Sequence, residues 1–240
     1  MFLNVRKRPF DSLRVRQAVN LAIDRDRVVE LTGGSQIGRP ACQILPTAFP
    51  GHAPYCPYTA RPAQGRSWTA PDLERARRLV AASERAGERV VVHMPDYEAR
   101  LARYYARLLE RLGFRVTLRI QDANALDTYE SDTRATTGMA QWGADYLAPS
   151  NFIEPNFGCA GEQNISRLCD RALDRRIEHA VEGPQRDATA AWAAVDRHVV
   201  DLAAAVPLTN RRSVVLVSKR VGNVRTHLQS FTLLDQMWVR

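Results

Sequence analysis

Apolar residues near the start of the chain recur at intervals of three and four, which is the spacing of a helix with one buried face. The stripe consists of Val15, Ala18, Val19, Ala22 and Ile23. Asp11 or Ser12 can cap this helix at its N-terminus. A second short helix is predicted from about residue 24 or 25 to 31, because Gly33 and Gly34 supply the backbone freedom that ends it.

Periodic structure is not expected between residues 38 and 70, where prolines interrupt the chain. The prolines of this stretch and its border are Pro40, Pro46, Pro50, Pro54, Pro57, Pro62 and Pro71. A loop of about thirty residues is unusual inside a compact domain and normally requires either pinning or a function.

Helical and extended patterns alternate after this loop. A helix is predicted from about residue 72 toward Gly87, and its buried face would consist of Leu73, Ala76, Leu79 and Val80. A strand from Arg89 to Met94, a helix over 97–112 and a strand over 114–120 follow. Strand, helix and strand in this order are typical of a right-handed crossover in an α/β sheet.

A weaker helix over 123–134 leads to residues 139–146, which are predicted to be a strand running into a functional loop. Helices are predicted over 165–181 and 186–205, separated by Gly183-Pro184. Residues 213–217 and 221–239 have a β-rich or irregular pattern, and no internal repeat is visible.

The net charge is +8, from 34 Lys and Arg against 26 Asp and Glu, and Lys7 and Lys219 are the only lysines. An arginine bias of this kind is typical of GC-rich coding. The other interpretation is a surface for polyanions, which would require the arginines to be bunched. They are interleaved with acids instead, and no nucleic-acid-binding motif is present. We therefore expect no nucleic-acid partner.

The longest apolar runs are Val90–Val92 and Val214–Val217, which are far shorter than the roughly 20 residues of a membrane-spanning helix. The first ten residues contain basic side chains but no apolar stretch and no cleavage site of the kind found in a signal peptide. We expect neither a membrane span nor an export signal in this sequence.

The cysteines form two local pairs, Cys42 with Cys56 and Cys159 with Cys169. Each pair encloses a loop that a disulfide can hold, and disulfides would place the protein in an oxidising compartment. Four buried thiols are the alternative. A metal site is less favoured, because neither pair has the close spacing of zinc ligands.

Searches for catalytic and cofactor motifs find no nucleophile elbow, zinc-protease helix, phosphate loop or dinucleotide fingerprint. The histidines are scattered, at His52, His93, His179, His198 and His227. We therefore expect a protein that is not an enzyme and has no catalytic residues, cofactor or metal.

Several segments together resemble the family 5 solute-binding proteins of ABC importers, which bind peptides and nickel, and actinobacterial members above all. The segments are 9–25 (PFDSLRVRQAVNLAIDR), 42–46 (CQILP) with 54–58 (PYCPY), 68–73 (WTAPDL), 142–146 (WGADY) with 149–152 (PSNF), and 233–240 (LLDQMWVR). The resemblance covers essentially the whole chain, and the first segment and the pair at 142–152 are specific in combination.

The resemblance implies an α/β fold, namely a lobe of the type 2 periplasmic-binding-protein class with a mixed sheet flanked by helices. Residues 1–208 would form the C-terminal ligand-binding lobe, and residues 209–240 would return through the hinge to complete the other lobe. Family members are typically about twice as long, with two lobes that close over the ligand. We therefore expect this chain to be the C-terminal half, with the export signal in the lost N-terminal part.

The resemblance also implies ligand-binding residues. Asp145 matches the aspartate that accepts the free α-amino group of the peptide in dipeptide-binding relatives, and Trp142 and Tyr146 would form the wall around it. In the alternative reading, Asp145 caps a turn before Pro149 and Trp142 belongs to the core. The sequence departs from the family pattern at Leu147-Ala148, where an aspartate often precedes the proline. A disulfide at the position of Cys159 and Cys169 is common in relatives, which supports both pairings.

The implied function is that of the substrate-binding component of an ABC importer, with an oligopeptide or dipeptide as ligand and the permease subunits as partners. The full-length protein would be an extracytoplasmic lipoprotein associated with the cell surface, held at the membrane only through a missing N-terminal anchor. Expressed as this fragment, it would be cytoplasmic. The alternatives are a ligand-sensing module of a cytoplasmic actinobacterial regulator and an inactive truncated fragment.

Overall fold

The structure is a computed structural model that describes residues 1–61, 67–122, 135–212, 214–227 and 231–240. Within these ranges the largest sheet has four strands, in the order β1, β5, β3, β4. They are β1 Phe2–Leu3, β5 Thr137–Gly138, β3 Arg89–Pro95 and β4 Arg115–Gln121. β3 is parallel to β4 and β5, whereas β1 is antiparallel to β5. The sheet is therefore mixed, as expected.

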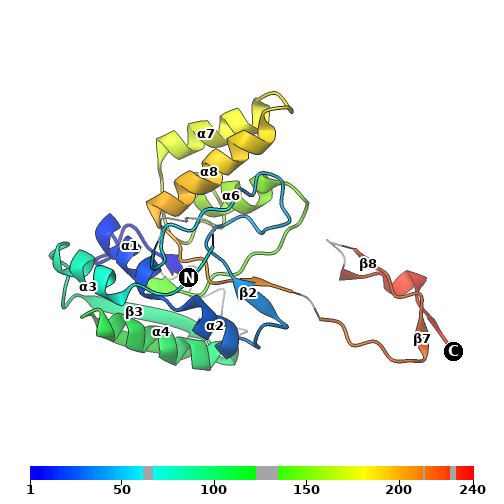
Figure 1. The fold of residues 1–240 in the computed structure, drawn as a ribbon, viewed down its shortest axis with the longest axis horizontal. Helices are drawn as coiled ribbons and strands as arrows, with labels where there is room; N and C mark the ends of the chain where they lie inside the picture. Colours follow the sequence, from blue (N-terminus) through cyan, green and yellow to red (C-terminus); the bar gives the residue numbers. More distant parts are fainter. Residues whose placement is uncertain (62–66, 123–134, 213, 228–230) are drawn as a thin grey trace.

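Helices cover this sheet in the lower part of the molecule (Figure 1). They are α1 Leu13–Ala22, α2 Arg25–Leu31, α3 Leu73–Ala81 and α4 Ala99–Arg111, with the 3-10 turn η2 Asp96–Glu98 before α4. The apolar stripe predicted on α1 is confirmed, since each of its residues is at most 3% exposed. α1 packs on α3, and α4 packs on β3 and β4. The predicted crossover of strand, helix and strand is thus confirmed as β3, α4 and β4.

The helix starts show which capping expectations hold. The side chains of Asp24 and Asp72 accept hydrogen bonds from the backbone N–H groups of Arg27 and Arg75, which caps α2 and α3. Ser12 is the N-cap residue of α1, but its side chain makes no capping hydrogen bond. α3 ends at Ala81, before the predicted Gly87.

A second apolar core lies in the upper part of the molecule, between α6 Pro149–Phe157, α7 Arg171–Glu182 and α8 Ala188–Leu202 (Figure 1). The prediction for α7 was wrong at its start, which lies at Arg171 rather than residue 165. The Asp170 side chain accepts a hydrogen bond from the Leu173 N–H there, so the helix is capped only after the disulfide at Cys169. α8 is shorter at both ends than the predicted 186–205.

Two further predictions need correction. No helix was predicted from the sequence at α6, which forms although Pro155 lies inside it; Pro149 occupies its first turn, where no backbone N–H is needed. The strand predicted over 139–146 was wrong, because these residues have no regular structure. The strand in this part of the chain, β5, comes just before them and comprises only Thr137–Gly138. The helix predicted over 123–134 lies outside the described residues.

The proline-rich segment contains one short strand, β2 Gly38–Pro40, which pairs with β6 Thr209–Arg211. After β2, Gln43 and Ile44 hydrogen-bond to Asp196 of α8, whereas Tyr58 packs in the core beneath the sheet-covering helices. Gly51 has a φ of 81° and lies against Trp192, where an added Cβ would come within 2.6 Å of the Trp192 Cβ. Only glycine therefore fits at this point of closest approach.

The C-terminal residues leave the body of the molecule and extend away from it (Figure 1). This tail, residues 214–240, contains β7 Val221–Gly222, β8 Thr226–His227, β9 Phe231–Thr232, η4 Leu234–Gln236 and β10 Trp238–Val239. β7 pairs with β10, and β8 pairs with β9. Leu216 is 96% exposed and Leu234 is 75% exposed, so the apolar side chains of the tail are largely uncovered.

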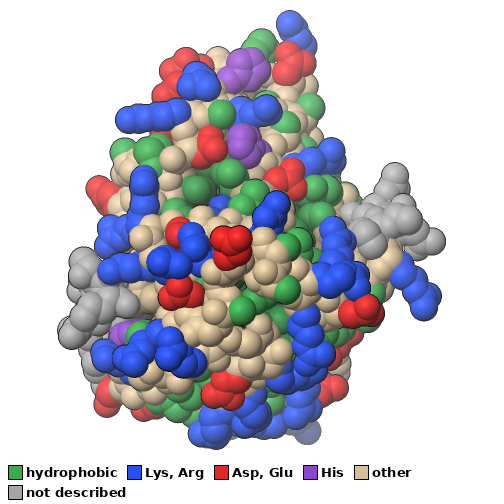
Figure 2. All heavy atoms as spheres, turned by 90° about the vertical axis from the view of Figure 1, so that its left-hand side faces the viewer, with side chains coloured by type: hydrophobic (Ala, Val, Ile, Leu, Met, Phe, Trp, Pro, Cys, Tyr) green, Lys and Arg blue, Asp and Glu red, His purple; other side chains and the backbone are tan. Residues whose placement is uncertain are grey.

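On the face that Figure 2 shows, the charged side chains are interleaved, as the sequence pattern predicts. Figure 2 shows Lys and Arg side chains spread over the viewed face and standing among Asp and Glu.

Asp11 was predicted as a possible cap of the first helix. Its carboxylate instead accepts hydrogen bonds from Nε and Nη2 of Arg85, at 3.1 and 2.9 Å.

Candidate functional site

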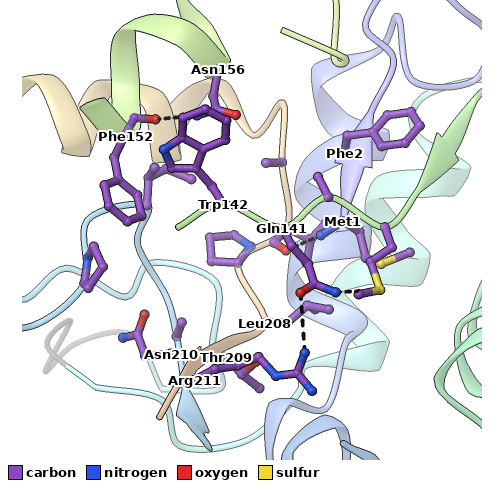
Figure 3. Close-up of a pocket in the computed structure, with 18 of the residues that line it drawn as sticks. Met1, Phe2, Gln141, Trp142, Phe152, Asn156, Leu208, Thr209, Asn210 and Arg211 are labelled. Carbon is purple, nitrogen blue, oxygen red and sulfur yellow. Dashed lines mark hydrogen bonds between the residues drawn. The ribbon is translucent and has the colours of Figure 1, made fainter. Parts of the chain in front are cut away.

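A cavity of about 420 Å³ lies where the sheet-bearing part of the chain meets the upper helices. Its wall comes from the first two residues, the disulfide loop of residues 42–56, residues 139–144, α6 and β6 (Figure 3). Cavities of this volume are in the range that binds small ligands. These segments are far apart in the sequence, so the cavity exists only in the folded chain.

Most of the wall is apolar or aromatic. Phe49 of the disulfide loop meets Phe152 of α6 edge to face, with ring centroids 4.7 Å apart. Trp142 lines the same cavity (Figure 3). The Trp142 indole nitrogen is buried and has no hydrogen-bond partner in the described ranges of the chain. Such a wall favours a ligand that brings apolar surface, because burying that surface is favourable.

Several polar side chains interrupt the apolar wall, and three of them, Glu98, Gln141 and Arg211, lie in contact with one another. Arg211 Nη2 is 3.5 Å from Glu98 Oε1, and Arg211 Nη1 donates to Gln141 Oε1 at 3.5 Å (Figure 3). Gln141 Nε2 donates in turn to the Tyr97 hydroxyl at 3.2 Å. Burial raises the pKa of the Glu98 carboxyl, and the Arg211 guanidinium lowers it in part.

The three residues predicted to bind the ligand have different positions. Trp142 lines the cavity, whereas Asp145 and Tyr146 are exposed on the same segment and do not belong to its wall. The Asp145 N–H donates to Asn151 Oδ1 at 2.9 Å, and Asn151 Nδ2 donates to Asp145 Oδ2 at 3.1 Å. This reciprocal pair fixes the Asp145 carboxylate at the start of α6, next to Ala144 of the cavity wall.

Sequence reasoning missed Glu98 and Arg211. Glu98 follows Pro95, where a parallel strand ends, and the carboxyl ends of parallel strands are where α/β sheets place their ligands. That signal could have identified Glu98. Nothing local marks Arg211, because its place in the wall results from the pairing of β6 with β2.

Asp196 of α8, which is completely buried, anchors the disulfide loop. Its carboxylate accepts hydrogen bonds from Gln43 Nε2 at 2.8 Å, from the Ile44 N–H at 3.1 Å and from the Leu45 N–H at 3.4 Å. Gln43 Oε1 accepts from the Tyr55 N–H at 2.7 Å, which fixes the orientation of the amide. Asp196 thus holds the part of the loop that contributes Gln43 and Ile44 to the cavity wall.

Asp196 is expected to make stability depend on pH. Burial raises its pKa from 3.8 to about 6, so between these values the folded chain keeps a proton that the unfolded chain has released. The contribution of this group to stability is lost as the pH rises through about 6. We expect the wild type to gain about 1 kcal/mol relative to Asp196→Asn between pH 7 and pH 5. Urea unfolding of both proteins at these pH values measures it, and a difference that does not change with pH contradicts it.

Disulfides join Cys42 to Cys56 and Cys159 to Cys169, as the local pairing predicts. The first closes the loop that lines the cavity, and the second lies just before α7. Among the described residues, no group of three or more His, Cys, Asp or Glu side chains could hold a metal ion. No helix in the described ranges combines the length and apolar character needed to cross a bilayer.

A mixed α/β lobe that presents an apolar cavity with a few polar groups has the architecture of a ligand-binding protein. The model of the family described as bacterial extracellular solute-binding proteins, family 5 (middle region), matches residues 1–164. The chain belongs to this family, whose members are binding proteins, and no enzyme family is indicated.

Two curated relatives have similar sequences. Di/tripeptide-binding protein 2 of Pseudomonas aeruginosa (strain UCBPP-PA14) is 27% identical over 192 residues, covering 74% of this chain and 33% of that protein. Probable di/tripeptide-binding protein 5 of the same strain is 25% identical over 236 residues, covering 91% of this chain and 41% of that protein. The chain therefore spans less than half the length of these relatives.

Solved structures show the same fold. A clavulanic acid biosynthesis oligopeptide binding protein matches with a TM-score of 0.84 and 22% identity, covering 99% of this chain and 45% of its own. An ABC transporter-associated periplasmic binding protein of Helicobacter pylori, in complex with a peptide, matches with a TM-score of 0.82 and 19% identity, covering 99% and 46%. The fold is that of the type 2 periplasmic binding proteins, and this chain corresponds to about half of such a structure.

Proposed function

We propose that this chain is the ligand-binding lobe of the substrate-binding component of an ABC importer and that its ligand is a short peptide. The observation that carries the proposal is the family match over residues 1–164, together with the aromatic cavity formed largely by the same residues. The curated relatives are named as di/tripeptide-binding proteins, which supports a peptide as the ligand class. The partners would be the permease subunits of the importer. The actinobacterial type rests on the sequence motifs alone.

We further propose that residues 1–208 form this lobe and that residues 209–240 return through a hinge to complete the other lobe. The tail supports this division, because it leaves the body and exposes apolar side chains that a second lobe would cover. These side chains are Val214, Val215, Leu216, Val217, Leu234, Trp238 and Val239. The two disulfides support an extracytoplasmic location for the full-length protein. Its lipid anchor is proposed from the family resemblance alone.

Isothermal titration calorimetry with a set of di- and tripeptides tests the function. It is run on the 240-residue chain and on the longest gene product that contains it. Saturable heat with peptides, and none with the free amino acids or with sugars, supports the proposal. If neither protein binds a peptide, the proposed peptide-binding function is contradicted and an inactive fragment is favoured. Free thiols in protein taken from its native host, seen by non-reducing mass spectrometry, would favour the cytoplasmic sensing module.

Asp145 is proposed to accept the free α-amino group of the peptide, with Trp142 and Tyr146 as the surrounding wall. The hydrogen bonds with Asn151 support this role, because they hold the carboxylate in one orientation at the segment that lines the cavity. A charge-assisted hydrogen bond to an ammonium is the interaction that a carboxylate offers here.

Replacing Asp145 by asparagine is therefore expected to weaken peptide binding roughly 10- to 100-fold, the equivalent of one hydrogen bond to a charged group. Acetylation of the peptide's amino group should weaken binding to the wild type equally and produce no further loss in Asp145→Asn. Asp187→Asn, which neutralises an exposed carboxylate of the upper helices, is the matched control. If acetylation and Asp145→Asn weaken binding additively, Asp145 does not bind the amino group.

A further inference from the structure

Glu98 is an unusual carboxylate for its position. Its side chain is only 8% exposed, and it lines a cavity whose wall is mainly apolar. Among the described residues its one charged partner is Arg211 at 3.5 Å, and no side chain or backbone N–H there donates a hydrogen bond to it. Buried carboxylates are normally satisfied by several donors, so this one, which lines the cavity, has acceptor capacity left over.

Arg211 offsets the charge of Glu98 only in part. The Arg211 side chain is 45% exposed, so water screens its charge, whereas the charge of the buried Glu98 is screened far less. Its contacts with Glu98 and Gln141 are both 3.5 Å long, beyond the distance of a strong charged hydrogen bond. The negative charge of the buried acid is therefore only partly neutralised by Arg211, although the chain as a whole carries a charge of +8.

The surroundings of Glu98 suit a long aliphatic group that ends in a cation. Leu101 lies one helical turn beyond Glu98 and lines the cavity, as do Met139 and Leu208. Met139 is adjacent to the polar side chains of the wall, because Gln141 Nε2 lies 3.8 Å from the Met139 sulfur. Lysine and arginine side chains bury their carbon stems along such walls while their charged ends pair with an acid.

We propose that Glu98 makes this cavity a subsite for a basic side chain of the ligand. The inference rests on the proposed peptide-binding function and adds a specificity to it. The ammonium or guanidinium of the ligand takes the open acceptor positions of the Glu98 carboxylate, and the aliphatic stem packs on Leu101, Met139 and Leu208. Glu98 is thus a specificity-determining residue, separate from the role given to Asp145.

Peptides that differ only in the charge of one side chain test the proposal. Calorimetry on the longest gene product that contains this chain compares tripeptides carrying lysine, norleucine or glutamate at each position in turn, at pH 8. We expect the lysine peptide to bind about 10-fold more tightly than its norleucine analogue at one position, the difference that one additional ion pair of about 1.4 kcal/mol produces. The glutamate peptide should bind most weakly at that position.

Glu98→Gln removes the charge and keeps the shape, so it is expected to abolish the difference between lysine and norleucine. Glu110→Gln, at an exposed glutamate of α4 outside the cavity wall, should leave the difference unchanged. The proposal is overturned if the wild type binds the lysine, norleucine and glutamate peptides with equal affinity at every position. It is also overturned if a preference for lysine remains in Glu98→Gln. A preference for glutamate would also overturn it and would assign the subsite to Arg211. If no peptide binds at all, the proposed function itself fails.

Discussion

Replacing Arg25 by methionine is expected to lower the free energy of unfolding by about 4 kcal/mol, as is typical when a buried charged donor is removed and its partners stay unpaired. Arg25 is 1% exposed at the start of α2. Burial lowers the pKa of its guanidinium to about 10, so the group remains charged at neutral pH.

The expected loss is large because Arg25 donates to backbone carbonyl oxygens in four separate stretches of the chain. Its Nε donates to the carbonyl oxygens of Ala41 at 2.8 Å and Pro207 at 3.0 Å, and its Nη1 donates to those of Asn20 at 3.1 Å and Tyr58 at 3.4 Å. One side chain thus ties α1, both ends of the disulfide loop and the chain leading into β6. Methionine fills much of the volume but leaves these buried carbonyl groups without this donor.

Urea unfolding followed by circular dichroism measures the effect. Arg27→Met is the matched control, because Arg27 lies on the same helix, is exposed and forms an ion pair with the exposed Glu30 at 2.6 Å. Its removal should change stability by less than about 0.5 kcal/mol. Equal losses for both variants would show that the buried network of Arg25 contributes nothing specific.

Opening the Cys42–Cys56 disulfide by the double substitution C42S/C56S is expected to lower the free energy of unfolding by about 3 kcal/mol, the loop-closure value for a loop of this length. The residues are 14 apart in the sequence. Peptide binding should weaken as well, since Ile44, Pro46 and Phe49 lie inside this loop and line the cavity. Loss of the cross-link gives these side chains more conformations to lose when the ligand binds.

C159S/C169S is the comparison variant, because its loop has a similar sequence separation of 10 residues. It should lose a similar free energy of unfolding. Its loop also contributes Gln163, Ile165 and Ser166 to the cavity wall, so its binding loss measures the share of the second loop. Wild-type peptide affinity in C42S/C56S would contradict a role of the Cys42–Cys56 disulfide in shaping the cavity.

Helices with a strong local pattern were predictable from the sequence. The predicted faces of α1 and α3 consist of residues three and four positions apart, and the contacts that form each helix lie within one or two turns. The strands β3 and β4 were recognised for a similar reason, as runs of β-branched residues on either side of a helix. α6 was missed because local rules assign Pro155 to a helix end, and packing of Phe152 and Phe157 in the second core outweighs that preference.

Short strands were not predictable. β1 pairs Phe2 with Gly138, and β2 pairs Gly38 with Arg211, so two or three residues of each strand are ordered only by a distant partner. No periodicity can appear in segments of this length. The pairing of β2 with β6 also brings Arg211 close to Glu98. The contact between these two charged side chains in the cavity wall was therefore not predictable from the sequence around either one.

The sequence by itself determined the helical faces, the central crossover, the two cysteine pairs and, through its motifs, the family. Each of these depends on residues that are close together in the chain or on a residue pattern long enough to be specific. The tertiary structure alone decided where the cavity lies, which charges face it and how Arg25 and Asp196 hold the long loop. These features depend on contacts between residues far apart in the chain, and only the folded core brings such residues together.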